Sequence, residues 1–382
     1  MERVAIIGIG LHPFGRSPGF SGLDQGVFAA RKALEDAELE WSDIGIAFGG
    51  SRSSGHAMAA TNQLGLTGLP FINLYTGCAT GGSSLFAAAN AIKSGAAKYA
   101  MAIGFDKHER GAFSPSAKNN DIPPWVSETG LMVTTQFFAL KLQRYMHDYN
   151  ISHDTLVKVA EKAFQNGSLN PNAWRKNIVP YKEIAESKMI NDPLRKYMFC
   201  SPAEGGAALI LTSETEVRKM GAKAVFLEAT EMRTKSYGSF EVYDTCLAVN
   251  IKPTATSNAA KAAFESAGIG PDDIDVLQIQ DTEVGAEIMH LAENGFCEHG
   301  EQENLIQSGE TLISGRIPVN TDGGCIANGE PIGASGLRQV YEICLQLRGQ
   351  AGLRQVLNSP EVGYTHVYGS PGVSAVNILS AS

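Results

Sequence analysis

Short apolar runs alternate with amphipathic stretches along the first part of the chain. The alternation predicts strands at residues 3–8, 44–48, 71–75, 99–103 and 207–212, and helices at residues 23–38, 55–64 and 81–94. Strands that alternate with helices favour a βαβ sheet covered by helices on both faces.

The pattern breaks between Lys107 and Phe199. Two helical stretches are predicted here, over residues 134–149 and 154–166, and the rest is irregular and polar. A long irregular insertion in a compact domain usually covers a site or an interface.

The second part of the chain repeats the α/β theme, although no internal sequence repeat is visible. The pattern predicts strands at residues 225–232, 276–280, 365–368 and 373–379, and helices at residues 256–267, 284–294 and 335–347. We expect an N-terminal half of residues 1–106 and 200–222, an insertion (loop domain) of residues 107–199, and a C-terminal half of residues 223–382.

Composition is that of an ordinary globular protein, with 382 residues, 43% hydrophobic and 19% charged. The formal net charge of -9 argues against a general nucleic-acid or anionic-membrane surface, but it leaves room for a local basic patch. No apolar run reaches membrane-spanning length. The six cysteines show no Cys-x-x-Cys pairs, so we interpret them as reduced thiols of a cytoplasmic protein without a metal site. They are Cys78, Cys200, Cys246, Cys297, Cys325 and Cys344.

Cys78 carries the strongest chemical signal. A strand-like run leads to it, small residues and glycines follow, and an alanine-rich helix begins at once. A thiol on such a strand-to-helix turn faces the positive end of the helix, which favours the nucleophilic thiolate. Backbone N–H groups of the turn could hold an oxyanion. The alternative is that Cys78 is a small buried hydrophobic residue.

The segment Cys78-Ala79-Thr80-Gly81-Gly82-Ser83-Ser84 resembles the nucleophile motif of the thiolase superfamily. Further segments resemble, in the right order, its sterol-carrier-protein-type branch, which includes lipid-transfer proteins; they are residues 4–16, 94–104, 200–209, 294–301 and 318–324. The resemblance implies a five-layered αβαβα fold of two similar halves, with Cys78 as the nucleophile, coenzyme A as a substrate and a symmetric homodimer.

Two catalytic positions depart from the family. Glu330 stands where the Gly-His-Pro motif has its histidine, and the resemblance assigns the following Gly333, Ala334 and Ser335 to CoA binding. A buried carboxyl group could act as a base, or as a protonated donor if its pKa is raised. The alternative is that Glu330 merely pairs with a cation.

The second departure is the segment Gln280-Asp281-Thr282-Glu283. Thr282 occupies the position of the branch's acid/base cysteine and does not titrate near neutrality. Gln280 can donate a hydrogen bond from its amide, and Asp281 or Glu283 could move protons. Acidic residues that open a helix are equally typical partners of the helix dipole.

Near the C-terminus, residues 365–372 align with the family's glycine loop. His366 matches the loop histidine of the branch, so we place this imidazole near the Cys78 thiol, with a structural role as the alternative. Gly369 could offer a backbone N–H opposite that of Cys78.

The leading interpretation is CoA-dependent thiolytic cleavage of a 3-oxoacyl-CoA through a Cys78 acyl-enzyme, in fatty-acid, steroid or aromatic-compound degradation. A retro-aldolase acting on a 3-hydroxyacyl-CoA is an alternative, since related steroid side-chain enzymes look like thiolases with altered catalytic residues. Those enzymes lack the nucleophilic cysteine that is kept here. A non-catalytic acyl-CoA-binding or scaffold subunit is the other alternative, suggested by the missing histidine and second cysteine.

The resemblance also implies a partner. Members of this branch commonly work with a small zinc-ribbon and OB-fold subunit of the DUF35 type, which helps to bind CoA, as in a two-subunit thiolase. A local basic pair is another source of phosphate binding, and Arg175-Lys176 in the insertion is one candidate. A solvated surface turn is the alternative for that pair.

Overall fold

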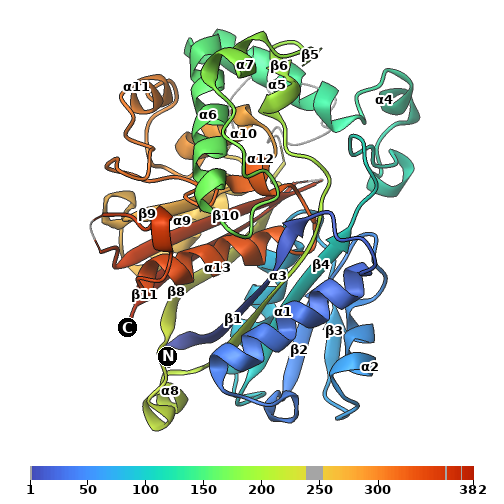
Figure 1. The fold of residues 1–382 in the computed structure, drawn as a ribbon, viewed down its shortest axis with the longest axis vertical. Helices are drawn as coiled ribbons and strands as arrows, with labels where there is room; N and C mark the ends of the chain where they lie inside the picture. Colours follow the sequence, from blue (N-terminus) through green and yellow to red (C-terminus); the bar gives the residue numbers. More distant parts are fainter. Residues whose placement is uncertain (1, 238–252, 358, 371) are drawn as a thin grey trace.

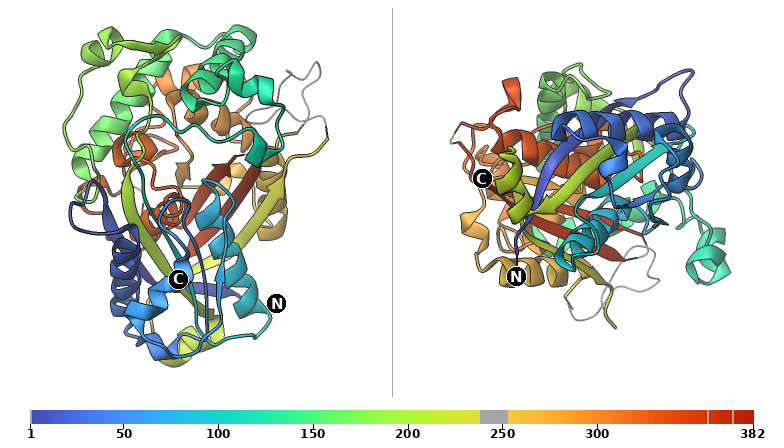
Figure 2. Two further views of the ribbon diagram at one scale, coloured as in Figure 1. Left: turned by 90° about the vertical axis from the view of Figure 1, so that its right-hand side faces the viewer. Right: turned by 90° about the horizontal axis from the view of Figure 1, so that it is seen from below.

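The computed structural model describes residues 2–237, 253–357, 359–370 and 372–382. Cys246 lies outside these ranges. Figure 1 shows the chain with its elements labelled, and Figure 2 shows two further views.

One mixed sheet runs through the molecule, with strand order β3-β2-β4-β7-β1-β8-β11-β10-β9. Its strands are β1 (Val4–Gly15), β2 (Ile46–Gly50), β3 (Phe71–Asn73), β4 (Ala100–Lys107), β7 (Glu204–Ser213), β8 (Val225–Thr234), β9 (Val276–Ile279), β10 (Val362–Gly369) and β11 (Val373–Ala381). A separate antiparallel pair is formed by β5 (Met189–Asn191) and β6 (Leu194–Arg195).

Strand β8 joins the two halves of the sheet. It pairs with β1 only over Val4–Ile6, whereas it pairs with β11 along most of its length. The first and last strands therefore lie on either side of β8, and both termini lie on the same side of the molecule (Figure 2).

Helices cover both halves and also fill the space between them. Helix α1 (Gly22–Ala37) packs on β1, β7 and β4, and α9 (Ala255–Ala267) packs on β8 and β11, next to α10 (Val284–Glu293). Between the halves lie α3 (Thr80–Lys93) and α13 (Ser335–Leu347), which contact each other and strands of both halves. Helices therefore lie outside and between the two halves of the sheet, in the five-layered α/β arrangement that the resemblance implies.

Glycines let the two central helices meet closely. A Cβ atom on Gly81 would lie 2.7 Å from the Leu337 nitrogen, and one on Gly336 would lie 2.9 Å from the Gly82 nitrogen. No side chain fits such contacts, so the small residues that follow Cys78 serve helix packing as well as the turn.

The insertion between β4 and β7 gathers at the top of Figure 1. Its helices are α4 (Pro124–Glu128), α5 (Thr134–Tyr149), α6 (His153–Leu169) and α7 (Tyr181–Glu186). The remaining α-helices are α2 (Thr61–Leu64), α8 (Glu214–Met220), α11 (Gln302–Gln307) and α12 (Gly324–Asn328). Helix α6 packs against α10, α11 and α12, which connects the insertion to the C-terminal part of the chain.

A buried ion pair fixes that contact. Lys162 of α6 pairs with Glu287 of α10, and their side chains are 3% and 0% exposed. Asn320 Nδ2 donates a hydrogen bond to Glu287 Oε2 at 2.8 Å. A buried carboxylate with a cation and an amide donor is stable, but it becomes costly when one partner is lost.

Within the described residues, no helix is long and apolar enough to cross a membrane. The same part of the chain holds no group of three His, Cys, Asp or Glu side chains suited to a metal ion. The five cysteines that the structure describes are free thiols.

We predict that Lys162→Met lowers the free energy of unfolding by about 3–5 kcal/mol, because Glu287 stays buried without its cation. Urea unfolding followed by circular dichroism would measure the change. The matched control is Lys182→Met, since the Lys182 side chain is 82% exposed and lies 3.9 Å from Glu186. The double variant Lys162→Met/Glu287→Gln should recover part of the loss. Equal stability of Lys162→Met and the control would contradict the role of the pair.

Candidate active site

A cavity of about 1310 Å³ lies where the two halves and the insertion meet. Cys78, Cys200 and Glu283 line it, together with residues of α5 and of the segment 111–121 that precedes α4. The insertion therefore covers the cavity that holds the predicted nucleophile.

The turn that carries Cys78 connects β3 to α3, as the sequence predicts. Gly77 has a φ of +59°, and a Cβ atom there would lie 2.7 Å from the Ser370 oxygen. Thr80 Oγ1 donates to the Gly77 oxygen at 2.6 Å, and Thr76 N donates to Thr80 Oγ1 at 3.0 Å. These bonds hold the Cys78 backbone in one conformation beside the loop after β10.

The Cys78 thiol is protonated at neutral pH, contrary to the sequence prediction of a thiolate. Burial raises the pKa of Cys78 well above its ordinary value, and the neighbouring Glu330 carboxylate raises the pKa further. The Arg52 guanidinium acts in the opposite direction but more weakly. Desolvation and the negative charge of Glu330 thus raise the pKa of Cys78 by more than the positive end of α3 lowers it.

Glu330 lies directly behind the nucleophile and is fully buried. Its backbone N–H donates to the Ser201 oxygen at 2.9 Å, and Gln280 Nε2 donates to its Oε1 at 3.4 Å. Burial raises the pKa of Glu330, while contacts with the thiols of Cys325 and Cys78 and the charge of Arg338 oppose that rise. A carboxyl group in contact with the Cys78 thiol is placed to accept its proton.

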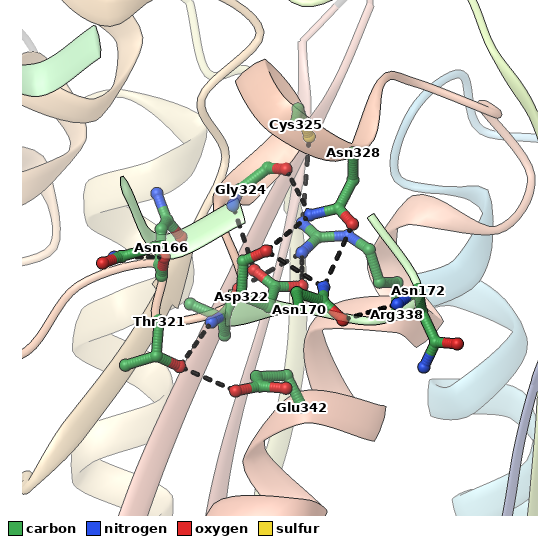
Figure 3. Close-up of polar contacts among 12 residues, drawn as sticks. Asn166, Asn170, Asn172, Thr321, Asp322, Gly324, Cys325, Asn328, Arg338 and Glu342 are labelled. Atoms are coloured by element: carbon green, nitrogen blue, oxygen red, sulfur yellow. Dashed lines mark hydrogen bonds and ion pairs between the residues drawn. The ribbon is translucent and has the colours of Figure 1, made fainter. Parts of the chain in front are cut away.

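A buried polar network surrounds Asp322 and Arg338 and includes Asn328 (Figure 3), which lies two residues before Glu330 in the sequence. Arg338 of α13 forms an ion pair with Asp322, and their side chains are 1% and 2% exposed. Asn328 Nδ2 donates to the backbone carbonyl oxygen of Asp322 at 3.0 Å, and Gly324 N donates to the carboxylate oxygen Asp322 Oδ1 at 3.0 Å. Helix α12, which ends at Asn328 just before Glu330, is therefore fixed to the central helix α13.

Asp281 belongs to the same support. Its carboxyl accepts from Cys325 N at 2.6 Å and from Ile326 N at 3.3 Å, so it holds the first turn of α12. Burial raises the pKa of Asp281 well above its ordinary value. The side chain does not line the cavity, and its bonds give it a structural task.

Gln280 and Glu283 both line the cavity and are buried. Glu283 caps α10 by accepting from Gly285 N, as the helix-start alternative anticipated. Burial raises the pKa of Glu283 to about 8. Gln280 Oε1 and Glu283 Oε1 have no hydrogen-bond partner among the described residues.

His366 does not reach the cavity wall. It is fully buried, its Nε2 lies 3.1 Å from Thr256 Oγ1, and its ring packs against His290 at 4.5 Å. Burial lowers the pKa of His366 well below its ordinary value. His290 lines the cavity in its place, with Nδ1 2.9 Å from the Gln280 oxygen and a pKa that burial lowers to about 3.

The glycine loop does meet the nucleophile turn. A Cβ atom on Gly369 would lie 2.2 Å from the Thr76 oxygen and 2.8 Å from the Ala79 nitrogen. By contrast, Gly333, Ala334 and Ser335 do not line the cavity. Gly333 N donates to Asp106 Oδ2 at 2.8 Å, and Ala334 and Ser335 are fully buried.

The predicted basic pair, Arg175 and Lys176, is not among the residues that line the cavity. Arg175 is partly buried and donates to the oxygens of Phe199 at 3.2 Å and Ile326 at 2.8 Å, so it has a structural task. Lys176 is exposed and donates to the Pro171 oxygen at 2.5 Å. In the part of the chain that the structure describes, the cationic side chains that line the cavity are Arg52, Lys118, Lys141, Lys196 and Lys235.

Two features of the site escaped sequence reasoning. Cys200 lines the cavity, although the resemblance of residues 200–209 to the family assigned no role to this thiol. Asp106 accepts from Ser51 Oγ at 2.9 Å and Ser53 N at 2.7 Å as well as from Gly333, so it ties the Arg52 loop to the Glu330 loop. A polar residue at the end of an apolar strand was the available signal for Asp106.

Comparisons with known proteins agree with this architecture. Residues 242–381 match the family model described as "Thiolase C-terminal domain-like". The chain is 32% identical to sterol carrier protein 2 of Homo sapiens, over 99% of this chain and 72% of that protein. It is 32% identical to acetyl-CoA acetyltransferase of Methanothermobacter thermautotrophicus, with both chains fully covered. The chain belongs to the thiolase superfamily of acyltransferases, in its sterol-carrier-protein-type branch.

One further sequence relative and one solved structure are similar to this chain. The chain is 28% identical to benzoylsuccinyl-CoA thiolase subunit BbsB of Thauera aromatica, over 96% of this chain and 95% of that one. Its fold is similar to a solved structure named "Ltp2-ChsH2(DUF35) aldolase", with a TM-score of 0.87, 24% identity and coverage of 100% and 98% of the two chains.

We predict that Glu330→Gln makes Cys78 react severalfold faster with iodoacetamide at pH 7, because loss of the carboxylate lowers the pKa of the thiol. In the wild type, labelling of Cys78 should keep rising as the pH passes the ordinary thiol range. Peptide mass spectrometry would follow Cys78 and, as internal control, Cys297, whose charged neighbours are Glu301 and Glu298. Unchanged labelling of Cys78 in the variant would show that Glu330 does not act on this thiol.

Proposed function

We propose that the protein cleaves a 3-oxoacyl-CoA by CoA-dependent thiolysis through an acyl-enzyme on Cys78. The observation that carries the proposal is the contact between the Cys78 thiol, which lines the cavity, and the buried Glu330 carboxyl group behind it. Nucleophile and base in contact, with the base held by other groups, is the arrangement that covalent catalysis requires.

Glu330 takes the part that the family gives to its histidine. At rest the thiol is neutral and the carboxyl group is the proton acceptor, because the Cys78 pKa is raised by both burial and Glu330. As the Cys78 sulfur bonds to the 3-oxo carbon, its proton passes to Glu330. The raised pKa of Glu330 makes the carboxylate a stronger base than an exposed glutamate.

The alkoxide that forms needs hydrogen-bond donors. We assign the backbone N–H groups of Cys78 and Gly369 to this task, since the Gly369 loop packs directly on the Cys78 turn. Collapse of the alkoxide breaks the bond between the α- and β-carbons and leaves the acyl group on Cys78. The thiol of CoA then removes that acyl group.

The cations of the cavity suit the phosphates of CoA. Among the described residues, five cationic side chains line the cavity wall, against the acidic Asp121 and Glu283, although the whole chain carries a net charge of -9. These cations replace Gly333, Ala334 and Ser335 in our assignment of CoA binding. Aromatic and apolar side chains such as Phe113, Phe138 and Met289 line the rest, which suits a bulky acyl group.

A retro-aldolase is the second candidate function. The structure with TM-score 0.87 is named an aldolase, and Thr282 replaces the second cysteine of the branch. A retro-aldol reaction needs no acyl-enzyme, however, and retention of Cys78 beside a base supports acyl transfer. A scaffold subunit would need neither group.

We predict that Cys78→Ala lowers CoA-dependent cleavage by on the order of 10³-fold or more, because no acyl-enzyme can form. Acetoacetyl-CoA and a 3-oxo-3-phenylacyl-CoA are suitable probes, with products identified by mass spectrometry. Cys297→Ala is the matched control, since Cys297 is a partly exposed thiol that does not line the cavity.

The same variants separate the alternatives. Cleavage of a 3-hydroxyacyl-CoA that persists in Cys78→Ala would replace thiolysis by the aldolase reaction. Acyl-CoA binding without any carbon–carbon cleavage in the wild type would favour the scaffold.

The last part of the proposal concerns assembly. We infer a homodimer that works with a small accessory subunit of the DUF35 type; the likeness to BbsB, a thiolase subunit, and to a structure named for a DUF35 complex supports this. We predict that the isolated chain binds CoA weakly and turns over poorly until the partner is added. Co-purification with mass spectrometry and light scattering would test both points. A fully active monomer would contradict them.

A further inference from the structure

The segment of residues 199–202 runs between the two loops that carry the altered catalytic positions. On one side, Cys200 N donates to the Thr282 oxygen at 2.9 Å, and Phe199 forms an antiparallel bridge with Glu283. On the other side, Glu330 N donates to the Ser201 oxygen at 2.9 Å. Cys200 is therefore held next to Thr282, the position where the branch has its acid/base cysteine.

The Cys200 side chain lines the same cavity as Cys78 and is partly exposed there. The other thiol beside Glu330, Cys325, is fully buried and does not line the cavity. Burial raises the pKa of Cys200 well above its ordinary value, and Glu330, Asp281 and Glu283 add to this while Arg175 opposes it. Cys200 is thus a neutral thiol at neutral pH, which is the form of an acid.

A second observation favours a polar ligand in this part of the cavity. Gln280 Oε1 and Glu283 Oε1 belong to cavity-lining side chains that are 1% and 0% exposed. Neither oxygen has a hydrogen-bond partner among the described residues. Buried polar atoms are normally paired, so a bound molecule is the natural source of the missing donors.

We propose that Cys200 is the second catalytic thiol of this protein, which protonates the α-carbon of the leaving acyl-CoA and then deprotonates the incoming CoA. The proposal rests on the thiolysis described above. Cys200, in a neighbouring segment, would perform the proton transfer that Thr282 cannot perform.

When the bond between the α- and β-carbons breaks, its electron pair moves to the α-carbon, and the Cys200 S–H proton is transferred there. The Cys200 thiolate then takes the proton of the CoA thiol. The CoA sulfur bonds to the acyl carbon, the bond to the Cys78 sulfur breaks, and Cys78 recovers its proton from Glu330.

Glu283 is the competing acid in this region. Its Oε2 accepts from Gly285 N at the start of α10, and its side chain is fully buried. The partly exposed Cys200 thiol forms no such side-chain bond with the described residues, which favours it for contact with a substrate.

Exchange of α-deuterium tests the proposal directly. The probes are acetyl-CoA and propionyl-CoA with deuterium at the α-carbon, incubated with the wild type, Cys200→Ala and Cys200→Ser, and followed by mass spectrometry. We expect both variants to lose exchange by a factor on the order of 10² to 10⁴. Alkylation of Cys78 by iodoacetamide should stay close to the wild-type rate, which shows that the cavity is intact.

Three further variants of the protein complete the exchange experiment. Cys297→Ala should exchange like the wild type. Cys200→Ala/Thr282→Cys should recover part of the activity, because it returns a thiol to the adjacent position. Glu283→Gln should lower exchange less than Cys200→Ala, because Glu283 lines the binding cavity without transferring its proton to the α-carbon.

The outcomes separate this inference from the proposed function. A wild type that never forms acyl-Cys78 would refute thiolysis itself. A wild type that forms acyl-Cys78 but shows no exchange, wild-type exchange in Cys200→Ala, or loss of exchange only in Glu283→Gln would each overturn the role of Cys200 and leave thiolysis standing.

Discussion

The buried ion pair between Arg338 and Asp322 is the constraint on which the site depends (Figure 3). Taking two charges out of water costs several kcal/mol for each ion, and the close pairing of opposite charges offsets that cost. Gly324 N donates to the Asp322 carboxylate and Asn328 Nδ2 donates to the Asp322 backbone oxygen, and Arg338 belongs to the helix that lies between the two halves of the sheet. The pair thereby fixes α12 and Glu330 relative to the Cys78 turn.

Glutamate in place of the family's histidine reverses the electrostatics of the nucleophile. A protonated imidazole would stabilise a thiolate, whereas a carboxylate raises the pKa of the thiol and keeps it neutral. In the acyl-transfer step, Cys78 is therefore activated by transfer of its proton to Glu330 as the new bond forms. This design protects the thiol from unwanted reactions, and it makes nucleophilicity depend on the ionisation of one buried carboxyl group.

Hydrophobic periodicity predicted the main elements well, because long buried helices and strands have strong patterns. The helices at residues 134–149 and 335–347 coincide with α5 and α13. Short elements such as α12 were missed, since a five-residue helix begun at Gly324 has no period to detect and depends on Asp281 and Asp322. In the site, the turn of Cys78 followed from local sequence. Three other features depend on contacts between segments that are distant in the sequence. They are the raised pKa of the Cys78 thiol, the position of His366 behind His290 and the position of Cys200 next to Thr282.

The central claim is that Glu330 accepts the Cys78 proton as the acyl-enzyme forms. Rapid-quench mass spectrometry of intact protein mixed with acetoacetyl-CoA would measure the rate of acyl-Cys78 formation across pH in the wild type and in Glu330→Gln. The account predicts one acyl group per active site and a wild-type rate that falls, as the pH falls, through a pKa above the ordinary glutamate value. The rate in Glu330→Gln should be lower by a factor on the order of 10² to 10⁴ and should lack that step. Product formation without any acyl group on Cys78, or equal rates in both proteins, would contradict it.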